Sequence, residues 1–213
     1  MSGTVGVMLS LKISNATYTF VRSNSGVFGS GGGTTTGVDT SGANLIVVGI
    51  WYHTGFGTAT ISDSKSNSWT ALTAYTNFGQ GVKLFYCENP TVDSGHTITT
   101  NAGYCGVGML AVSSTGSITY QTVTGAAANA SGNLQPGSIT PSVNDSILVT
   151  AFGSFNGAAP TTPSGYTSIA NNTTGTAEAG GMAYKIQTTA SAENPTWNGT
   201  GTSQAATMMC FNP

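Results

Sequence analysis

Apolar residues along the chain alternate with polar ones or gather in short runs, and Gly, Asn, Ser or Pro bounds each run. This pattern is typical of β-strands, because successive side chains of a strand point to opposite faces. No longer segment carries a helical stripe of apolar side chains, so we expect almost no helix. The predicted strands lie at 5–13, 16–21, 44–52, 82–87, 105–112, 146–152, 181–186 and 206–211.

The chain contains an internal repeat, with one copy at about 42–113 and a second at about 144–213. Each copy begins with an apolar strand and a Gly-containing turn, and Phe85 of the first copy matches Tyr184 of the second. One copy has too few strands to bury both faces of a sheet alone. We therefore predict an all-β fold in which the two copies form one two-sheet, jelly-roll-like β-sandwich.

The region before the first copy differs in composition from the rest. Residues 23–42 are rich in Gly, Ser and Thr, which is typical of a flexible connection. We therefore divide the chain into an N-terminal region, 1–42, and a sandwich domain, 43–213. The apolar strands of region 1–42 need a partner surface, so we expect this region to be an attachment or oligomerisation arm. A homo-oligomer follows, and a trimer is favoured by analogy with fibres.

Charged residues make up only 6% of the chain, against roughly 25% in an average soluble domain, so the surface must be rich in neutral polar groups. Five Lys and Arg residues and a net charge of -2 provide no basic stripe, and we expect no nucleic-acid partner. No apolar run approaches the roughly 18 residues of a membrane-spanning helix, and we expect no membrane insertion. The first residues lack the features of a signal peptide and read as a strand.

Three cysteines, Cys87, Cys105 and Cys210, are too few for a disulfide scaffold, and their odd number leaves at least one unpaired. Two of the three residues that match them in the other copy are apolar, as expected for core positions. We predict that all three are buried free thiols and that Cys87 and Cys105 are not bridged.

Several segments together resemble a β-sandwich module of phage virion and bacterial surface proteins. They are GANLIVVGIWY from Gly42, DSKSNSWTAL from Asp63, KLFYCENPTVDSGHTITT from Lys83, LQPGSITPSVNDSILVTAF and ENPTWNG. The sequence departs from the family pattern at Lys65-Ser66, where Gly is common before the Asn, and at Phe85, where Tyr is common. The resemblance covers about 170 residues and implies the fold, but it says little about function.

No residue pattern indicates catalysis, a cofactor or a metal ion. Asp63 and Asp93 lie in turn-like contexts, where Asp bonds its own backbone, and Ca²⁺ ligation is the less favoured alternative. His53 and His96 lack a second metal ligand at suitable spacing, and no serine lies in a G-x-S-x-G turn. A jelly-roll lyase or glycosidase would need a cleft lined with charged groups, which a chain with one Arg does not favour. We therefore predict a protein that is not an enzyme.

Aromatic residues near predicted loops are the best candidates for a recognition surface, and they are Tyr52, Phe56, Tyr75 and Phe78. Trp69 and Trp197 lie within strands and are expected in the core. The first hypothesis is a phage virion structural protein, a capsid decoration or a tail-fibre or receptor-binding component, with other virion proteins as partners. It would be made in the host cytoplasm and released by lysis. The alternative is an extracellular carbohydrate-binding module of a secreted or cell-surface protein, with a surface glycan as partner.

Overall fold

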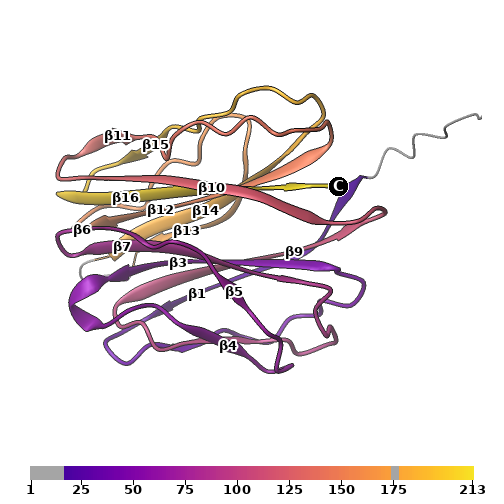
Figure 1. The fold of residues 1–213 in the computed structure, drawn as a ribbon. Helices are drawn as coiled ribbons and strands as arrows, with labels where there is room; N and C mark the ends of the chain where they lie inside the picture. Colours follow the sequence, from indigo (N-terminus) through magenta and orange to yellow (C-terminus); the bar gives the residue numbers. More distant parts are fainter. Residues whose placement is uncertain (1–16, 174–177) are drawn as a thin grey trace, which may run out of the picture.

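The structure is a computed structural model that describes residues 17–173 and 178–213. This part of the chain consists of antiparallel β-strands joined by turns, with one short 3-10 helix, Thr54–Phe56, and no α-helix. Figure 1 shows the strands stacked in layers. The predicted all-β class is confirmed, and the strand predicted at 5–13 lies outside the described residues.

The two halves of the chain each contribute a series of strands. The first half contains β1 (Tyr18–Phe28), β2 (Gly33–Thr34), β3 (Leu45–His53), β4 (Ile61–Asp63), β5 (Thr70–Ala71), β6 (Tyr75–Asn77), β7 (Gln80–Glu88), β8 (Ile98–Thr100) and β9 (Cys105–Ser114). The second half contains β10 (Thr119–Ala128), β11 (Gly132–Leu134), β12 (Ser146–Phe155), β13 (Thr167–Thr173), β14 (Glu178–Gln187), β15 (Trp197–Gly199) and β16 (Ser203–Asn212).

Each half builds one large sheet and one small sheet. In the first half the large sheet has the order β1-β9-β3-β7-β5, with β6 also paired to β7, and the small sheet has the order β2-β8-β4. In the second half the large sheet has the order β10-β16-β12-β14-β13, and the small sheet pairs β11 with β15. The strands of the two halves therefore correspond in order, and the predicted duplication is confirmed at this level.

In each half the first three strands and the last three strands pass from the large sheet to the small sheet and back, and the first strand pairs with the last. This is the jelly-roll order. We expected one jelly roll built from both copies, whereas each copy forms a jelly roll of its own, and the two large sheets face each other in the middle (Figure 1). The expectation missed the small sheets because their strands are only two or three residues long and leave no periodic signal.

The central strands of both large sheets are buried on both faces. Strands β3, β9, β12 and β16 are almost entirely buried, since one face meets the opposite large sheet and the other meets a small sheet or its loops. A strand covered on both sides has no reason to alternate, which explains the continuous apolar runs in the sequence.

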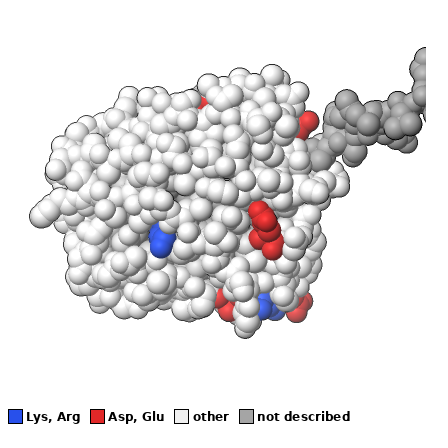
Figure 2. All heavy atoms as spheres, in the orientation of Figure 1, with Lys and Arg blue, Asp and Glu red and all other residues white. Residues whose placement is uncertain are grey.

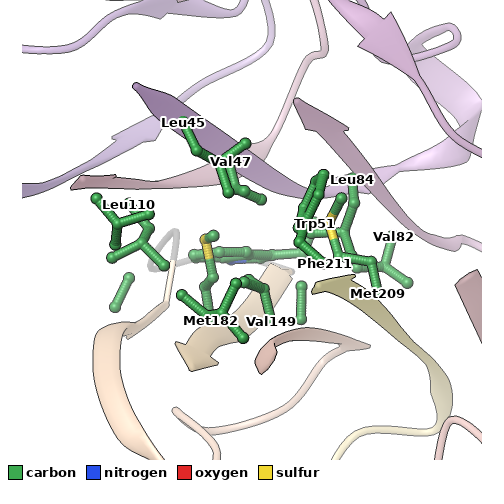
Figure 3. Packing of buried hydrophobic residues seen from close by; sticks show 14 of the residues in the cluster. Leu45, Val47, Trp51, Val82, Leu84, Leu110, Val149, Met182, Met209 and Phe211 are labelled. Carbon is green, nitrogen blue, oxygen red and sulfur yellow. The ribbon is translucent and has the colours of Figure 1, made fainter. Parts of the chain in front are cut away.

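The side chains between the two large sheets form the main core. Figure 3 shows Leu45, Val47 and Leu110 of the first half pointing towards Met182 and Val149 of the second. Burying a side chain of this size contributes about 1.5–3 kcal/mol. The two halves are therefore joined by a hydrophobic interface and not by a linker alone.

Trp51 occupies a part of this core that glycines of both sheets border. It is fully buried, and a Cβ atom at Gly106 would lie 2.2 Å from its indole ring. A Cβ atom at Gly180, on the facing sheet, would lie 2.3 Å from the same ring. The ring therefore fills space that exists only because both neighbouring positions lack a side chain.

The N-terminal strand belongs to the sandwich, which corrects the predicted division at residue 42. Strand β1 pairs with β9 along its length, and Tyr18 packs into the core between the large sheets. Its counterpart β10 pairs with β16 in the same way, and both strands carry a register shift, at Phe20/Arg22 and at Tyr120/Thr122. The repeat therefore starts at β1, and the Gly- and Ser-rich composition of 23–42 hid the end of β1 and all of β2. The part of the predicted arm at 1–16 lies outside the described residues.

The predicted match between the copies is one residue out of register on one strand. Phe85 lies on β7 and Tyr184 on β14, which are equivalent strands, as expected. Phe85, however, packs on the outer face of its sheet, whereas Tyr184 packs between the large sheets. The residue of β7 that packs between the large sheets, as Tyr184 does on β14, is the neighbouring Tyr86, because side chains alternate between the two faces along a strand. Tyr184 therefore matches Tyr86. The four consecutive apolar residues of β7, Leu84 to Cys87, conceal this alternation in the sequence.

The three cysteines are buried and free. The predicted absence of a disulfide between Cys87 and Cys105 is confirmed.

Candidate functional site

Of the four residues predicted to form a recognition surface, Tyr52 is a core residue and Tyr75 is half-buried against the core. Tyr52 is 2% exposed and lies over Gly81, where a Cβ atom would come within 2.6 Å of its ring. Tyr75 packs against the main core, with its ring 2.4 Å from the position of a Cβ atom at Gly125. Both rings pack over glycines of other strands, and the burial of Tyr52 keeps its ring from a ligand.

The other two predicted residues are exposed. Phe56 is 47% exposed in the 3-10 helix after β3, and Phe78 is 83% exposed in the turn between β6 and β7. These two segments lie at the same end of the sandwich, on the left in Figure 1. The predicted surface is therefore reduced to Phe56 and Phe78, and other residues complete it.

A chain of aromatic rings runs across this end of the sandwich. The ring of His53 meets the ring of Phe155 edge-on at 5.1 Å between centroids and the ring of Phe56 at 5.2 Å. Phe56 meets Tyr104 at 4.8 Å in the same manner. We call His53, Phe56, Phe78, Tyr104 and Phe155 the aromatic rim. Edge-on contacts of this kind stabilise by about 0.5–1.5 kcal/mol each beyond the area that they bury.

The aromatic rim borders an open hollow. The hollow has a volume of about 460 Å³ and is lined by His53, Thr54, Gly55, Phe78, Gly79 and Phe155. No Lys, Arg, Asp or Glu is among these residues. Its chemistry is therefore that of aromatic rings together with the polar groups of His53 and Thr54.

The local sequence fixes the position of the rim. His53 ends β3 and caps the 3-10 helix, since its Nδ1 accepts a hydrogen bond from the backbone N–H of Gly55 at 2.9 Å. In the neutral ring the proton is then on Nε2, which leaves a donor for another group. Gly79 has a φ of 79° in the turn that carries Phe78, a conformation that favours glycine.

Sequence reasoning missed His53, Tyr104 and Phe155 as members of the rim. They come from the ends of β3 and β12 and from the residue before β9, which are far apart in the sequence. The only sequence signal was that each stands where an apolar run meets a Gly- or Asn-containing turn. That signal does not say which turns share one end of the sandwich.

A second cluster has the order of groups found in a catalytic triad. The Nε2 atom of His96 lies 3.3 Å from the carboxylate of Asp63, and its Nδ1 atom lies 2.9 Å from the hydroxyl oxygen of Thr40. The side chains of Asp63 and His96 have no exposed surface, and Thr40 is 0% exposed. A substrate cannot reach the hydroxyl, so this cluster joins the loops of the first half and is not a site.

Asp63 has the turn role that the sequence predicted. Its carboxylate accepts hydrogen bonds from the backbone N–H groups of Lys65 at 2.9 Å and Asn67 at 3.0 Å, and from Trp69 Nε1 at 3.0 Å. Burial alone would raise the pKa of Asp63, but the hydrogen bonds from Asn67, Lys65 and His96 outweigh it and hold the pKa below its ordinary value. Trp69 packs in the outer core of the first half, as expected, and Trp197 is fully buried.

The other reactive side chains are not arranged for chemistry. Burial raises the pKa of the Cys105 and Cys210 thiols to about 12, so neither is a thiolate near neutral pH. Within residues 17–173 and 178–213, no group of three or more His, Cys, Asp and Glu side chains could hold a metal ion. In the same ranges no helix is long and apolar enough to cross a membrane.

The comparisons with known proteins add no identity to this picture. No family model matches the chain, and neither the search of curated proteins nor the search of solved structures found a match. The assignment of function therefore rests on the fold, the surface and the aromatic rim.

Proposed function

We propose that this protein is a phage virion structural protein exposed on the particle, as a capsid decoration or a tail-fibre or receptor-binding component. It acts by packing and adhesion and not by catalysis, and its partners are other virion proteins. The observation that carries the proposal is the joining of two jelly-roll halves through the buried facing sides of their large sheets. Jelly rolls are frequent in viral capsid and lectin domains, and this support is an analogy of fold.

The surface supports a display role. Figure 2 shows a face that is mostly uncharged, with few charged side chains and several of these gathered at its lower edge. Such a surface interacts with water through neutral hydrogen bonds, and salt has few charges to screen. The assembly would then keep its solubility and its contacts over a wide range of ionic strength, which suits a particle released into variable surroundings.

The test of the proposal is the location of the protein. Particles from a culture that produces the protein would be purified on a density gradient and probed with an antibody against the folded chain. We expect the protein to band with the particles and immunogold grains to mark their outside. Recovery only as free protein in the medium would contradict the proposal.

The alternative is a carbohydrate-binding module of a secreted or cell-surface protein. The exposed rings of Phe56 and Phe78 favour it, because aromatic faces are suited to sugar rings. The gradient separates the two candidates, since a secreted module does not travel with particles.

A further inference from the structure

Phe78 is the most exposed large hydrophobic side chain of the described residues, at 83%. A single exposed ring is ordinary, but this one borders a hollow whose other aromatic walls are His53 and Phe155. The turn holds Phe78 there through a hydrogen bond from its own backbone N–H to the Asn77 side chain at 2.8 Å. The ring is thus presented by a two-residue turn between paired strands and not by a long loop.

Contacts among its own residues hold the floor of the hollow in place. Phe155 closes β12 and meets His53 edge-on, and His53 in turn is fixed by its bond to the backbone of Gly55. A Cβ atom at Gly79 would lie 3.4 Å from the ring of Phe155, so that turn packs directly over it. A site that is already in place loses little conformational entropy when a ligand binds.

The lining selects for an uncharged ligand with both an apolar face and hydroxyl groups. It has no charged side chain to neutralise an acid or a base. Aromatic faces offer contact to C–H groups, while His53 and Thr54, which also line the hollow, carry an imidazole nitrogen and a hydroxyl that can form hydrogen bonds. The volume, about 460 Å³, lies within the range of small-molecule sites. A neutral sugar ring combines these properties, whereas a purely apolar peptide would leave the polar groups unused.

We propose that the aromatic rim binds a neutral sugar unit of a surface glycan, with the sugar ring stacked on Phe78 and its hydroxyl groups at His53 and Thr54. This goes beyond the virion role, because it holds for a particle protein and for a secreted one alike. A failure of the gradient experiment would therefore contradict only the virion role, and a failure of the glycan-binding experiment would contradict only the binding site.

The test uses immobilised neutral oligosaccharides of hexoses and N-acetylhexosamines, with sialylated and uronic-acid glycans as charged comparisons. Affinity for the best ligand is then measured by titration calorimetry with the full chain. We expect neutral glycans to bind and Phe78→Ala to weaken binding by about threefold to tenfold, which is the range for one aromatic contact. Phe78→Trp should retain binding, since it keeps a flat ring at the same position.

Phe20→Ala is the matched control. Phe20 is 45% exposed on β1 and does not line the hollow, so its loss should leave glycan affinity unchanged. Thr54→Val keeps the shape of Thr54 and removes its hydroxyl, so it should weaken binding without lowering the melting temperature.

Three results would overturn the proposal. The first is that no neutral glycan binds, and the second is that Phe78→Ala binds as well as the native chain. The third is that Phe78→Ala dissociates an oligomer in light scattering, which would make the rim a contact between copies of the chain.

Discussion

Glu178 provides the sharpest test of the packing between the two large sheets. It begins β14, pairs with Phe155 and is 1% exposed. Burial removes water from the carboxyl group and raises its pKa from 4.5 to about 8. The perturbation that we propose is Glu178→Gln, which keeps the size of the side chain and removes its titration.

The sign of the effect follows from the two pKa values. Below pH 4.5 the carboxyl is protonated in both states, and its burial has no pH-dependent penalty. Between pH 4.5 and 8 the unfolded chain releases the proton while the folded chain keeps it, so the free energy of unfolding falls as pH rises. At about 1.4 kcal/mol per unit of pKa difference, the loss is about 3 kcal/mol at pH 7 and levels off above pH 8 at about 5 kcal/mol.

The assay is urea unfolding at fixed protein concentration, followed by tryptophan fluorescence at each pH unit from 4 to 8. Glu178→Gln should match the native chain at pH 4 within about 1 kcal/mol and exceed it by about 3 kcal/mol at pH 7. The control is Glu88→Gln, which removes a charge at an exposed position at the end of β7. Curves for Glu178→Gln and the native chain that stay parallel across the pH range would refute the reasoning.

Three further predictions concern the outer cluster, the core and the assembly. Asp63→Asn should lower the free energy of unfolding by about 2–4 kcal/mol near neutral pH, since Asp63 is a buried carboxylate that faces His96. Because the folded pKa of Asp63 is lowered, the stabilisation that its carboxylate provides is present above pH 3.8 and lost as the pH falls through the folded pKa. A difference in the free energy of unfolding between Asp63→Asn and the native chain that does not narrow in acid would contradict this. Gly106→Ala places a Cβ atom 2.2 Å from Trp51 and should cost about 3 kcal/mol, whereas Gly31→Ala, with nothing within 4 Å, should have little effect; equal melting temperatures would disprove this packing. Light scattering of the full chain should give a multiple of 21.4 kDa, three-fold for the favoured trimer, and a monomer mass would exclude the oligomer.

The long strands could be predicted from the sequence because each is a run of apolar residues between turn residues. Strands β3, β9, β12 and β16 fall where these runs predicted them. The small sheets could not be predicted, since strands such as β2 and β8 are too short for a period of two to be seen. These small sheets cover the outer faces of the large sheets. Without them, the sequence predicted one jelly roll made of both copies, whereas each copy forms its own.

The candidate site was predictable only in part. Phe56 and Phe78 are exposed because they stand in short turns, which the sequence shows. Tyr52 and Tyr75 occupy similar positions in the sequence, but Tyr52 is buried and Tyr75 half-buried, because Gly81 and Gly125 on other strands leave room for their rings. That contact links residues distant in the sequence or on different strands, and no local pattern reports it.

The two halves share a strand order but close their outer layers with different chemistry. An isolated bridge places His96 opposite Val38 in the first half, and the equivalent bridge places Glu193 opposite Ile139 in the second. His96 meets the carboxylate of Asp63, whereas Glu193 forms an ion pair with Lys185. Neither cluster takes part in the core between the large sheets, so the outer layers can differ while the shared face must fit side chain by side chain. Substitutions in an outer cluster should therefore loosen one half, and substitutions in the shared core should unfold both halves together.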